Sequence, residues 1–294
     1  MPRQPKSQHY IQRAYLEAFC DPTPNEKKGA PFLWVHSANH AVRQIPKECA
    51  VENYFYCHEL DDGQRSFLGE TFLADLESAS SCVLKAAQQG NLPTTLRDRF
   101  TLTGYVAMTL VRTPASKKHI DQTAINHTVQ GVRDLVNDPL RLAEYCAEME
   151  RETGEPHDPE EQKRIVMAGK VRCVQTSRAW SLKRMGELMM HFQKMFMRMN
   201  LFLARADSGF FVTSDSPVRV HNPATAPLLP EGYQSFEMLF PLSREFCLVG
   251  SYSTAPGRLK LTANQVKDLN MELIRQADRF IYARPSMPIT SRRN

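Results

Sequence analysis

The sequence of 294 residues has no long apolar run. A membrane-spanning helix needs roughly 18 consecutive apolar residues, and no stretch approaches that length. The start, MPRQPKSQHY, also lacks the apolar segment of a secretory signal. We therefore expect a cytoplasmic protein with no membrane-spanning part.

The sequence also lacks the cysteine pattern of a disulfide framework or a common zinc site. Its cysteines are Cys20, Cys49, Cys57, Cys82, Cys146, Cys173 and Cys247. They are odd in number, widely spaced and without a CxxC pair, which predicts reduced thiols, many of them in the core. The spacing of His36, His40, Cys49 and Cys57 fits no common zinc pattern, so zinc is disfavoured as a cofactor.

Several signatures of known enzyme classes are missing as well. The sequence has no Walker loop and no GxGxxG, GxSxG or HExxH motif. The nucleotide-binding, α/β-hydrolase and zincin classes therefore lose their usual support. The formal charge of +5 and the pI of 8.8 are mildly basic, which suits a polyanionic partner without requiring one.

What is present indicates a folded globular chain. Hydrophobic residues make up 42% of the sequence and charged residues 23%. Although the length also allows two closely packed domains, we expect a single domain over residues 1–294.

The N-terminal part predicts one helix followed by two strands. Ser7 resembles an N-cap for a helix over HYIQRAYLEAF, which the Pro-rich cluster at 21–24 would end. On that helix His9 and Arg13 lie one turn apart, on the face away from the core. Aromatic and β-branched residues predict strands at 31–36 and 52–57.

The middle of the sequence, about 66–206, is predicted to be a helical insertion. Apolar spacing indicates helices at 66–90, 95–112, 114–136 and 139–150, followed by a linker-like stretch at 154–162. Residues 160–206 contain no proline and carry Met, Leu and Phe at helical spacing, which predicts one long helix or two packed end to end. The methionine stripe is expected to be core, with a partner-binding surface as the alternative.

The last part, about 207–294, is β-rich. Short apolar runs separated by Pro, Gly and Asn predict three to five mostly antiparallel strands, with a helix at 262–277 before the last strand. The fold class predicted is α+β, mainly helical. Its helical middle is inserted into a small, mostly antiparallel sheet built from N- and C-terminal segments.

Several segments together resemble one family. They are His9-Tyr10-Ile11, Tyr15-Leu16, Phe19, Leu33-Trp34-Val35, Pro46-Lys47, 52–56, Glu70 to Glu77, Arg112-Thr113-Pro114, 211–218 and Phe240-Pro241-Leu242-Ser243. In this order they are similar to the DUF4238 family, a bacterial domain of unknown function. The resemblance spans nearly the whole chain, and one departure is Gln12, where such sequences usually have proline. The resemblance implies no activity.

Asp215 and His9 are the first candidate catalytic residues. Asp215 follows the apolar run GFFVT, and strand ends commonly hold site residues; the alternative is an Asx-turn that caps the following backbone. His9 can transfer protons near neutral pH, and Arg13 can bind a phosphate. The alternative for both is an ordinary surface or packing role.

Glu70, Glu77 and Arg112 complete the candidate site. The two glutamates are seven residues apart, two helical turns, and so point to nearly the same side. With Asp215 they form a ligand set for Mg²⁺, or Glu77 serves as a catalytic base; a solvated helix face is the alternative. Arg112 can bind substrate phosphate or pair with a buried carboxylate.

Two functions follow from these candidates. The first is a nucleic-acid phosphodiester hydrolase, a nuclease of a bacterial defence or conflict system, with His9, Glu77 and Asp215 catalytic and with Arg13 and Arg112 holding phosphate. In it, alanine at His9 or Asp215 abolishes activity and spares stability. The alternative is a non-catalytic binding or regulatory module that recognises a nucleic acid or a protein, the latter through Met189–Met195. A small-molecule enzyme stays open.

Overall fold

A computed structural model of the chain describes residues 7–21, 31–38, 40–59, 65–169, 177–221, 238–252 and 258–283. The chain divides into two compact units, one made of Met1–Ser116 with Met185–Asn294 and the other of Lys117–Arg184. Within the described ranges, no helix has the length and apolarity to cross a membrane. The cysteines in these ranges are free thiols, and Cys173 lies outside them.

The first unit is built around a five-stranded sheet. Its strands are β7 (Asn200–Ala206), β9 (Arg219–Val220), β10 (Met238–Pro241), β11 (Phe246–Ser251) and β12 (Arg258–Leu261). The order is β12-β7-β11-β10-β9, and every pair is antiparallel except β12 with β7. The small, mostly antiparallel sheet expected near the C-terminus is therefore confirmed.

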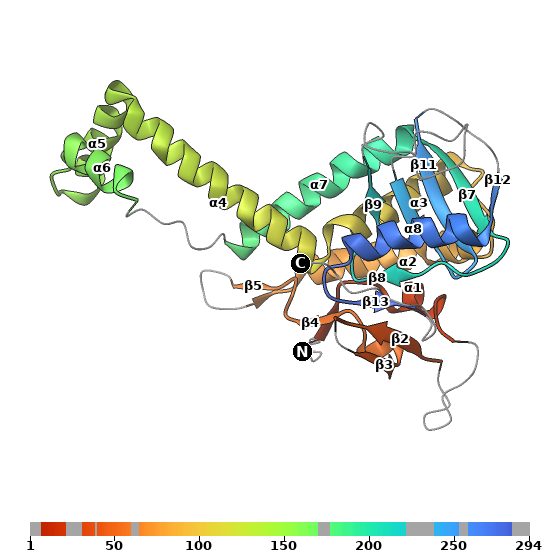
Figure 1. The fold of residues 1–294 in the computed structure, drawn as a ribbon. Coiled ribbons are helices and arrows are strands. Elements are labelled where there is room, and N and C mark those ends of the chain that lie inside the picture. Colours follow the sequence, from red (N-terminus) through yellow and green to blue (C-terminus); the bar gives the residue numbers. More distant parts are fainter. Residues whose placement is uncertain are drawn as a thin grey trace. The chain divides into compact units, whose positions relative to one another are not determined.

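Helices cover both faces of this sheet (Figure 1). Helix α8 (Ala263–Gln276) begins at the predicted place with a capping box formed by Thr262 and Gln265. Its Val266 and Leu269 join the buried strand residues of one face. On the other face lies α3 (Leu96–Val111), whose Tyr105 ring is 6.2 Å from the Phe240 ring. The apolar sequence of α3 is explained by this central position, since its residues from Leu102 to Thr109 are buried.

A second sheet joins the two ends of the chain. It consists of β2 (Leu33–His36), β3 (Ala41–Gln44), β8 (Thr213–Ser214) and β13 (Ile281–Tyr282), in the antiparallel order β3-β2-β13-β8. N- and C-terminal segments therefore do share a sheet, as predicted. This sheet is separate from the five-stranded one, so the β structure of the two ends is not a single sheet.

The predicted N-terminal helix is wrong in its first half. Residues Ser7–His9 form strand β1, antiparallel to β4 (Val51–Asn53), and helix α1 covers only Arg13–Glu17. The physical reason is Gln8, which is fully buried. Its Oε1 accepts from the Tyr56 amide at 2.8 Å and its Nε2 donates to the Cys57 sulfur at 3.3 Å, bonds that fix this segment beside β4.

The other N-terminal elements are short. The strand predicted at 52–57 is β4, which ends early because Tyr54 has a positive φ of 54° and turns the chain. A 3-10 helix covers Pro46–Glu48, and a hairpin pairs β5 (His58–Glu59) with β6 (Arg65–Ser66). Helix α2 (Leu68–Gln88) follows and matches its prediction.

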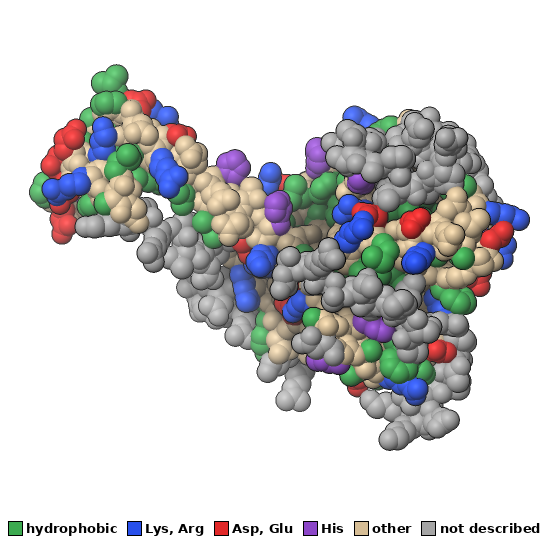
Figure 2. Space-filling view, viewed as in Figure 1, with side chains coloured by type: hydrophobic (Ala, Val, Ile, Leu, Met, Phe, Trp, Pro, Cys, Tyr) green, Lys and Arg blue, Asp and Glu red, His purple; other side chains and the backbone are tan. Residues whose placement is uncertain are grey.

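The second unit is helical. It contains most of α4 (Pro114–Asn137), α5 (Pro139–Thr153), α6 (Pro159–Met167) and the first residues of α7 (Arg178–Arg198). Asp138 and Asp158 cap α5 and α6, and Gly154 ends α5 in the left-handed conformation. A small core of Val136, Leu142 and Cys146 joins these helices, whose outer surface carries acidic and basic side chains (Figure 2).

The prediction of helix throughout 160–206 is wrong in its last part. Helix α7 ends at Arg198, and residues 200–206 form β7, which pairs with β11 on one side and β12 on the other. Pairing on both edges overrides the helical pattern of the sequence. Met185, Met189 and Met199 are buried, as expected for core, while Met190 is 53% exposed.

Candidate functional site

A pocket of ≈ 570 Å³ opens where β1, α1 and α2 meet in the first unit. It is lined by Ser7, His9, Gln12, Arg13, Ala14, Glu17, Tyr56, Glu70, Leu73, Ala74, Glu77 and Arg112. Of the six candidate residues from the sequence, all except Asp215 line it. The pocket therefore places a histidine, acidic groups and arginines around one open space.

Arg112 holds the walls of this pocket together. It follows α3 and is only 2% exposed. Its Nε donates to the Tyr10 carbonyl at 2.6 Å, its Nη2 to the His9 carbonyl at 2.9 Å and its Nη1 to Glu77 Oε1 at 2.5 Å. The expected pairing with a carboxylate is thus present, although Glu77 is partly exposed rather than buried, and the guanidinium is occupied by protein acceptors. This geometry favours a positioning role over the phosphate contact we predicted.

Arg112 holds the backbone carbonyl of His9, and the imidazole side chain lies in a partly buried environment. Burial lowers the pKa of its imidazole below the ordinary value of 6.5, and a hydrogen bond to the Lys47 backbone partly offsets the effect. Its Nε2 is buried and has no hydrogen-bond partner in the described parts of the chain. A histidine in this environment is neutral near pH 7 and has one ring nitrogen uncommitted, which suits a general base.

The two glutamates of α2 differ in their environment. Glu77 forms an ion pair with Arg112, whereas burial raises the pKa of Glu70 above its ordinary value of 4.5. Arg112 lowers the Glu70 pKa in part, and the charge of Glu77 raises it further. The environment of Glu70 therefore favours its protonated form, which suits a general acid.

Arg13 lies at the rim of the pocket. Its side chain is 60% exposed and pairs with Glu17 one turn along α1, with Nε 2.9 Å from Oε1. A single exposed pair of this kind is weak and opens readily. Arg13 can therefore leave Glu17 and turn toward an anion that enters the pocket. Beside Arg13, Gln12 Oε1 is buried and has no hydrogen-bond partner among the residues described.

Asp215 lies outside this pocket and has a different environment. It is 1% exposed, and its carboxylate accepts backbone N–H groups from Asp278 at 2.8 Å, Arg279 at 2.7 Å and Phe280 at 3.0 Å. The backbone N–H of Asp215 donates in turn to the Phe280 carbonyl. These bonds tie the end of β8 to the start of β13, which is a structural function. The Asx-turn alternative predicted bonds to the residues directly after Asp215, whereas the observed donors belong to a distant segment, 278–280.

The predicted set of Mg²⁺ ligands is not assembled. Glu70 and Glu77 share the pocket, but the Asp215 carboxylate is engaged with backbone amides elsewhere. In the described ranges no three His, Cys, Asp or Glu side chains gather in a metal-binding group, and this includes the disfavoured zinc set at 36–57.

Three further residues of the pocket could not be identified from the sequence. Ser7, Gln12 and Tyr56 line it because β1 pairs with β4, which brings the turn at 54–56 to the start of the chain. Arg13 and Glu17, four residues apart, form an ion pair at the pocket that helix spacing could have revealed. Long-range strand pairing of this kind leaves no local pattern.

Comparison with known proteins places the chain in a family. The family described as "Protein of unknown function (DUF4238)" matches residues 7–287. The chain belongs to the DUF4238 family. Neither curated proteins nor solved structures gave a match. The matched residues of this DUF4238 chain include those that line the pocket of His9 and those that form the hydrogen bonds around Asp215.

Proposed function

We propose that this chain is a nuclease, a phosphodiester hydrolase that acts at the pocket of His9. The observation that carries the proposal is the pairing of opposite pKa shifts in one open site. Burial lowers the pKa of His9 and raises that of Glu70, so the environment of this pocket favours the neutral form of the base and the protonated form of the acid. Groups whose environments push their pKa values apart are typical of acid–base catalysis.

The residues of the pocket divide the work of cleaving a phosphodiester. His9 removes the proton from the attacking oxygen, and Glu70 gives a proton to the leaving oxygen. Arg13 at the rim binds the phosphate. Arg112 and Glu77 hold the His9 backbone and α2 in place, and so set the position of both catalytic groups.

The acid–base arrangement favours RNA as the substrate. In RNA the 2′-hydroxyl lies beside the phosphate, so a base that removes its proton starts an intramolecular attack. DNA lacks this hydroxyl and requires an activated water molecule. We therefore expect RNA to be cleaved in preference to DNA, with a cyclic phosphate as the first product.

The test is incubation of the purified chain with end-labelled RNA and DNA of one sequence, with and without EDTA. We expect cleavage of RNA that EDTA does not prevent. His9→Gln and Glu70→Gln should each lose about 100-fold or more in kcat, as is usual when a general base or acid is removed. Matched controls are His119→Gln on α4 and the exposed Asp75→Asn on α2, which should cleave as the wild type does.

Two results would contradict the proposal. If the wild type cleaves neither nucleic acid under any of these conditions, the pocket does not support a nuclease. If RNA is cleaved but both His9→Gln and Glu70→Gln retain full activity, the reaction takes place at another site. Thermal unfolding of each variant separates a loss of catalysis from a loss of fold.

A further inference from the structure

A second pocket, of ≈ 230 Å³, lies in the same unit and has a different composition. It is lined by Phe19, Asp21, Trp34, Gly209, Phe210, Phe211, Val212, Arg244, Tyr282 and Ala283. Aromatic residues from four separate segments of the chain therefore meet around one cavity. Its volume is below the roughly 300 Å³ at which sites for drug-sized ligands begin, so it suits a single small ring system.

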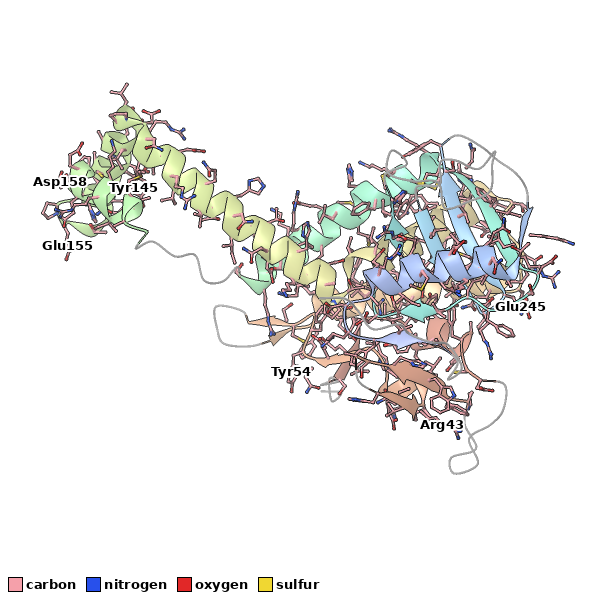
Figure 3. The ribbon with its side chains drawn as sticks, viewed as in Figure 1. Arg43, Tyr54, Tyr145, Glu155, Asp158 and Glu245 are labelled. Carbon is pink, nitrogen blue, oxygen red and sulfur yellow. The ribbon has the colours of Figure 1, made fainter. Side chains whose placement is uncertain are left out.

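Two of the aromatic side chains are exposed enough to meet a ligand. Phe210 is 41% exposed, which is unusual for a phenylalanine, and Trp34 is partly exposed on β2. The Arg43 guanidinium lies 4.8 Å from the Trp34 ring centroid and adds a positive charge beside this ring. Figure 3 labels Arg43 on its strand, β3. Flat aromatic surfaces of this kind bind planar rings by stacking.

One cation of the pocket has an unused donor. The Arg244 guanidinium stacks on Phe210 at 4.8 Å, and its Nη1 donates to the Cys20 carbonyl at 2.9 Å. Its Nη2 is buried and has no hydrogen-bond partner in the part of the chain that the structure describes. Because a buried donor without a partner is destabilising, an acceptor atom that reaches Nη2 gains a strong contact. Arginine favours planar acceptors such as ring nitrogens and exocyclic oxygens.

Helix α1 connects this pocket with the first one. Arg13 lines the pocket of His9, and Phe19 lines the aromatic pocket. Backbone hydrogen bonds continue the helical turn as far as Cys20, so the six steps from Arg13 to Phe19 span about 9 Å at 1.5 Å each. Successive phosphates of one stacked strand lie about 3.4 Å apart along its axis, and so a few nucleotides cover this distance.

We propose that the aromatic pocket is a nucleobase-binding subsite, where one base of a single-stranded nucleic acid stacks on Trp34 and Phe210 and accepts a hydrogen bond from Arg244. The choice of ligand rests on the proposed nuclease function. In this arrangement the base in the aromatic pocket holds the strand while a phosphodiester a few nucleotides away lies at His9. Stacking tolerates every base, and the Arg244 donor adds preference for a base with an acceptor at its edge.

The test uses the fluorescence of Trp34. The chain has only one other tryptophan, Trp180, so a Trp180→Phe protein reports on the aromatic pocket alone. This protein is titrated with AMP, GMP, CMP and UMP, and with ribose 5-phosphate as the probe that lacks a base. We expect the nucleotides to quench Trp34 emission, and ribose 5-phosphate to have no effect.

Two variants in this background probe the contacts. Phe210→Leu keeps an apolar side chain but removes the ring, and Arg244→Gln removes the charge. Since stacking on one aromatic residue changes affinity by about fivefold or more, each should raise the nucleotide Kd by at least that factor. An unchanged thermal midpoint of Phe210→Leu shows that the fold is kept. Equal quenching by ribose 5-phosphate, or an unchanged Kd in both variants, would overturn the subsite.

A His9→Gln variant distinguishes this proposal from the proposed function. It should bind nucleotides as tightly as the wild type and fail to cleave RNA. Quenching by nucleotides in a wild type that cleaves no RNA would support the subsite and reject the nuclease. Cleavage of RNA at an unchanged KM in Phe210→Leu, together with no quenching, would support the nuclease and reject the subsite.

Discussion

Replacing Asp215 by alanine should destabilise the first unit of this protein. The carboxylate is buried and accepts three backbone N–H groups, at 2.7 to 3.0 Å, from residues 278–280. Without it these donors lose their partners, and each buried donor left unpaired costs about 1 to 3 kcal/mol. The flanking residues 278–280 are partly exposed, so water replaces some of the lost bonds. We expect a loss of about 3 kcal/mol in the free energy of unfolding.

Thermal and urea unfolding, followed by circular dichroism, measure this loss. For a chain of this size, about 3 kcal/mol corresponds to a fall in Tm of roughly 6 to 12 °C. The matched control is Asp207→Ala, an exposed aspartate just after β7, which should change stability by less than about 0.5 kcal/mol.

The opposite result would refute this account of Asp215. If Asp215→Ala unfolds as the wild type does and loses only its activity, the carboxylate acts in catalysis, as the sequence first indicated. If Asp215→Asn is as stable as the wild type, the negative charge is not required for the three backbone bonds. Either result would return Asp215 to the candidate catalytic residues.

Four further outcomes are expected. Arg112→Lys should lose about 3 kcal/mol of stability in urea unfolding, because a lysine cannot reach three acceptors around a buried position; unchanged stability would contradict this. The pH profile of kcat/KM should be bell-shaped with a maximum on the acidic side of neutral, since His9 must be neutral and Glu70 protonated, and Glu70→Gln should remove the alkaline limb. Burial lowers the pKa of His9, so its neutral form contributes fully to stability above pH 6.5, and this contribution is lost as pH falls through the folded-state pKa. When unfolding is measured from pH 7 to 5, His9→Gln should therefore lose less stability than the wild type. Met189→Ser should lower Tm by several degrees and the exposed Met190→Ser should not, and equal effects would contradict the burial that separates them.

Helices such as α3 and α8 were predictable because their signals are local. Thr95 caps α3 through its bond to the Asp98 amide, and Thr262 with Gln265 forms the capping box of α8. Such signals depend on residues within one turn of each other, and a sequence shows them directly. The same holds for the buried α3, whose apolar residues on every side indicate a central helix.

Strands at the chain ends were harder to predict because tertiary contacts decide them. Residues 200–206 carry a helical pattern, yet they form β7 because β11 and β12 offer hydrogen bonds along both edges. Ser7–His9 forms a strand because Gln8 is held by groups at 56 and 57, far along the sequence. Local propensity is weak compared with such contacts.

The candidate site was predicted in part for the same reason. Glu70 and Glu77 share a side because helix geometry places residues seven apart together, which a sequence shows. That His9 lies in the same pocket depends on Arg112, whose three hydrogen bonds join the end of β1 and Tyr10 to α2. The role of Asp215 could not be read from the sequence, because an aspartate at a strand end has the same sequence pattern whether it meets a substrate or a backbone, and only its partners distinguish the two.

The position of Arg112 implies that the pocket and the fold depend on one another. A buried arginine is costly unless acceptors surround it, and here those acceptors are the His9 and Tyr10 carbonyls and the Glu77 carboxylate. The bonds that compensate for its burial are thus the same bonds that fix the His9 backbone and bring α2 beside it. A residue placed only for stability could bond any nearby carbonyl. Arg112 instead bonds the backbone of His9, the candidate base, and the carboxylate of Glu77, which lies beside the candidate acid Glu70. It therefore also sets the distance between base and acid, so a change at Arg112 should alter both stability and catalysis.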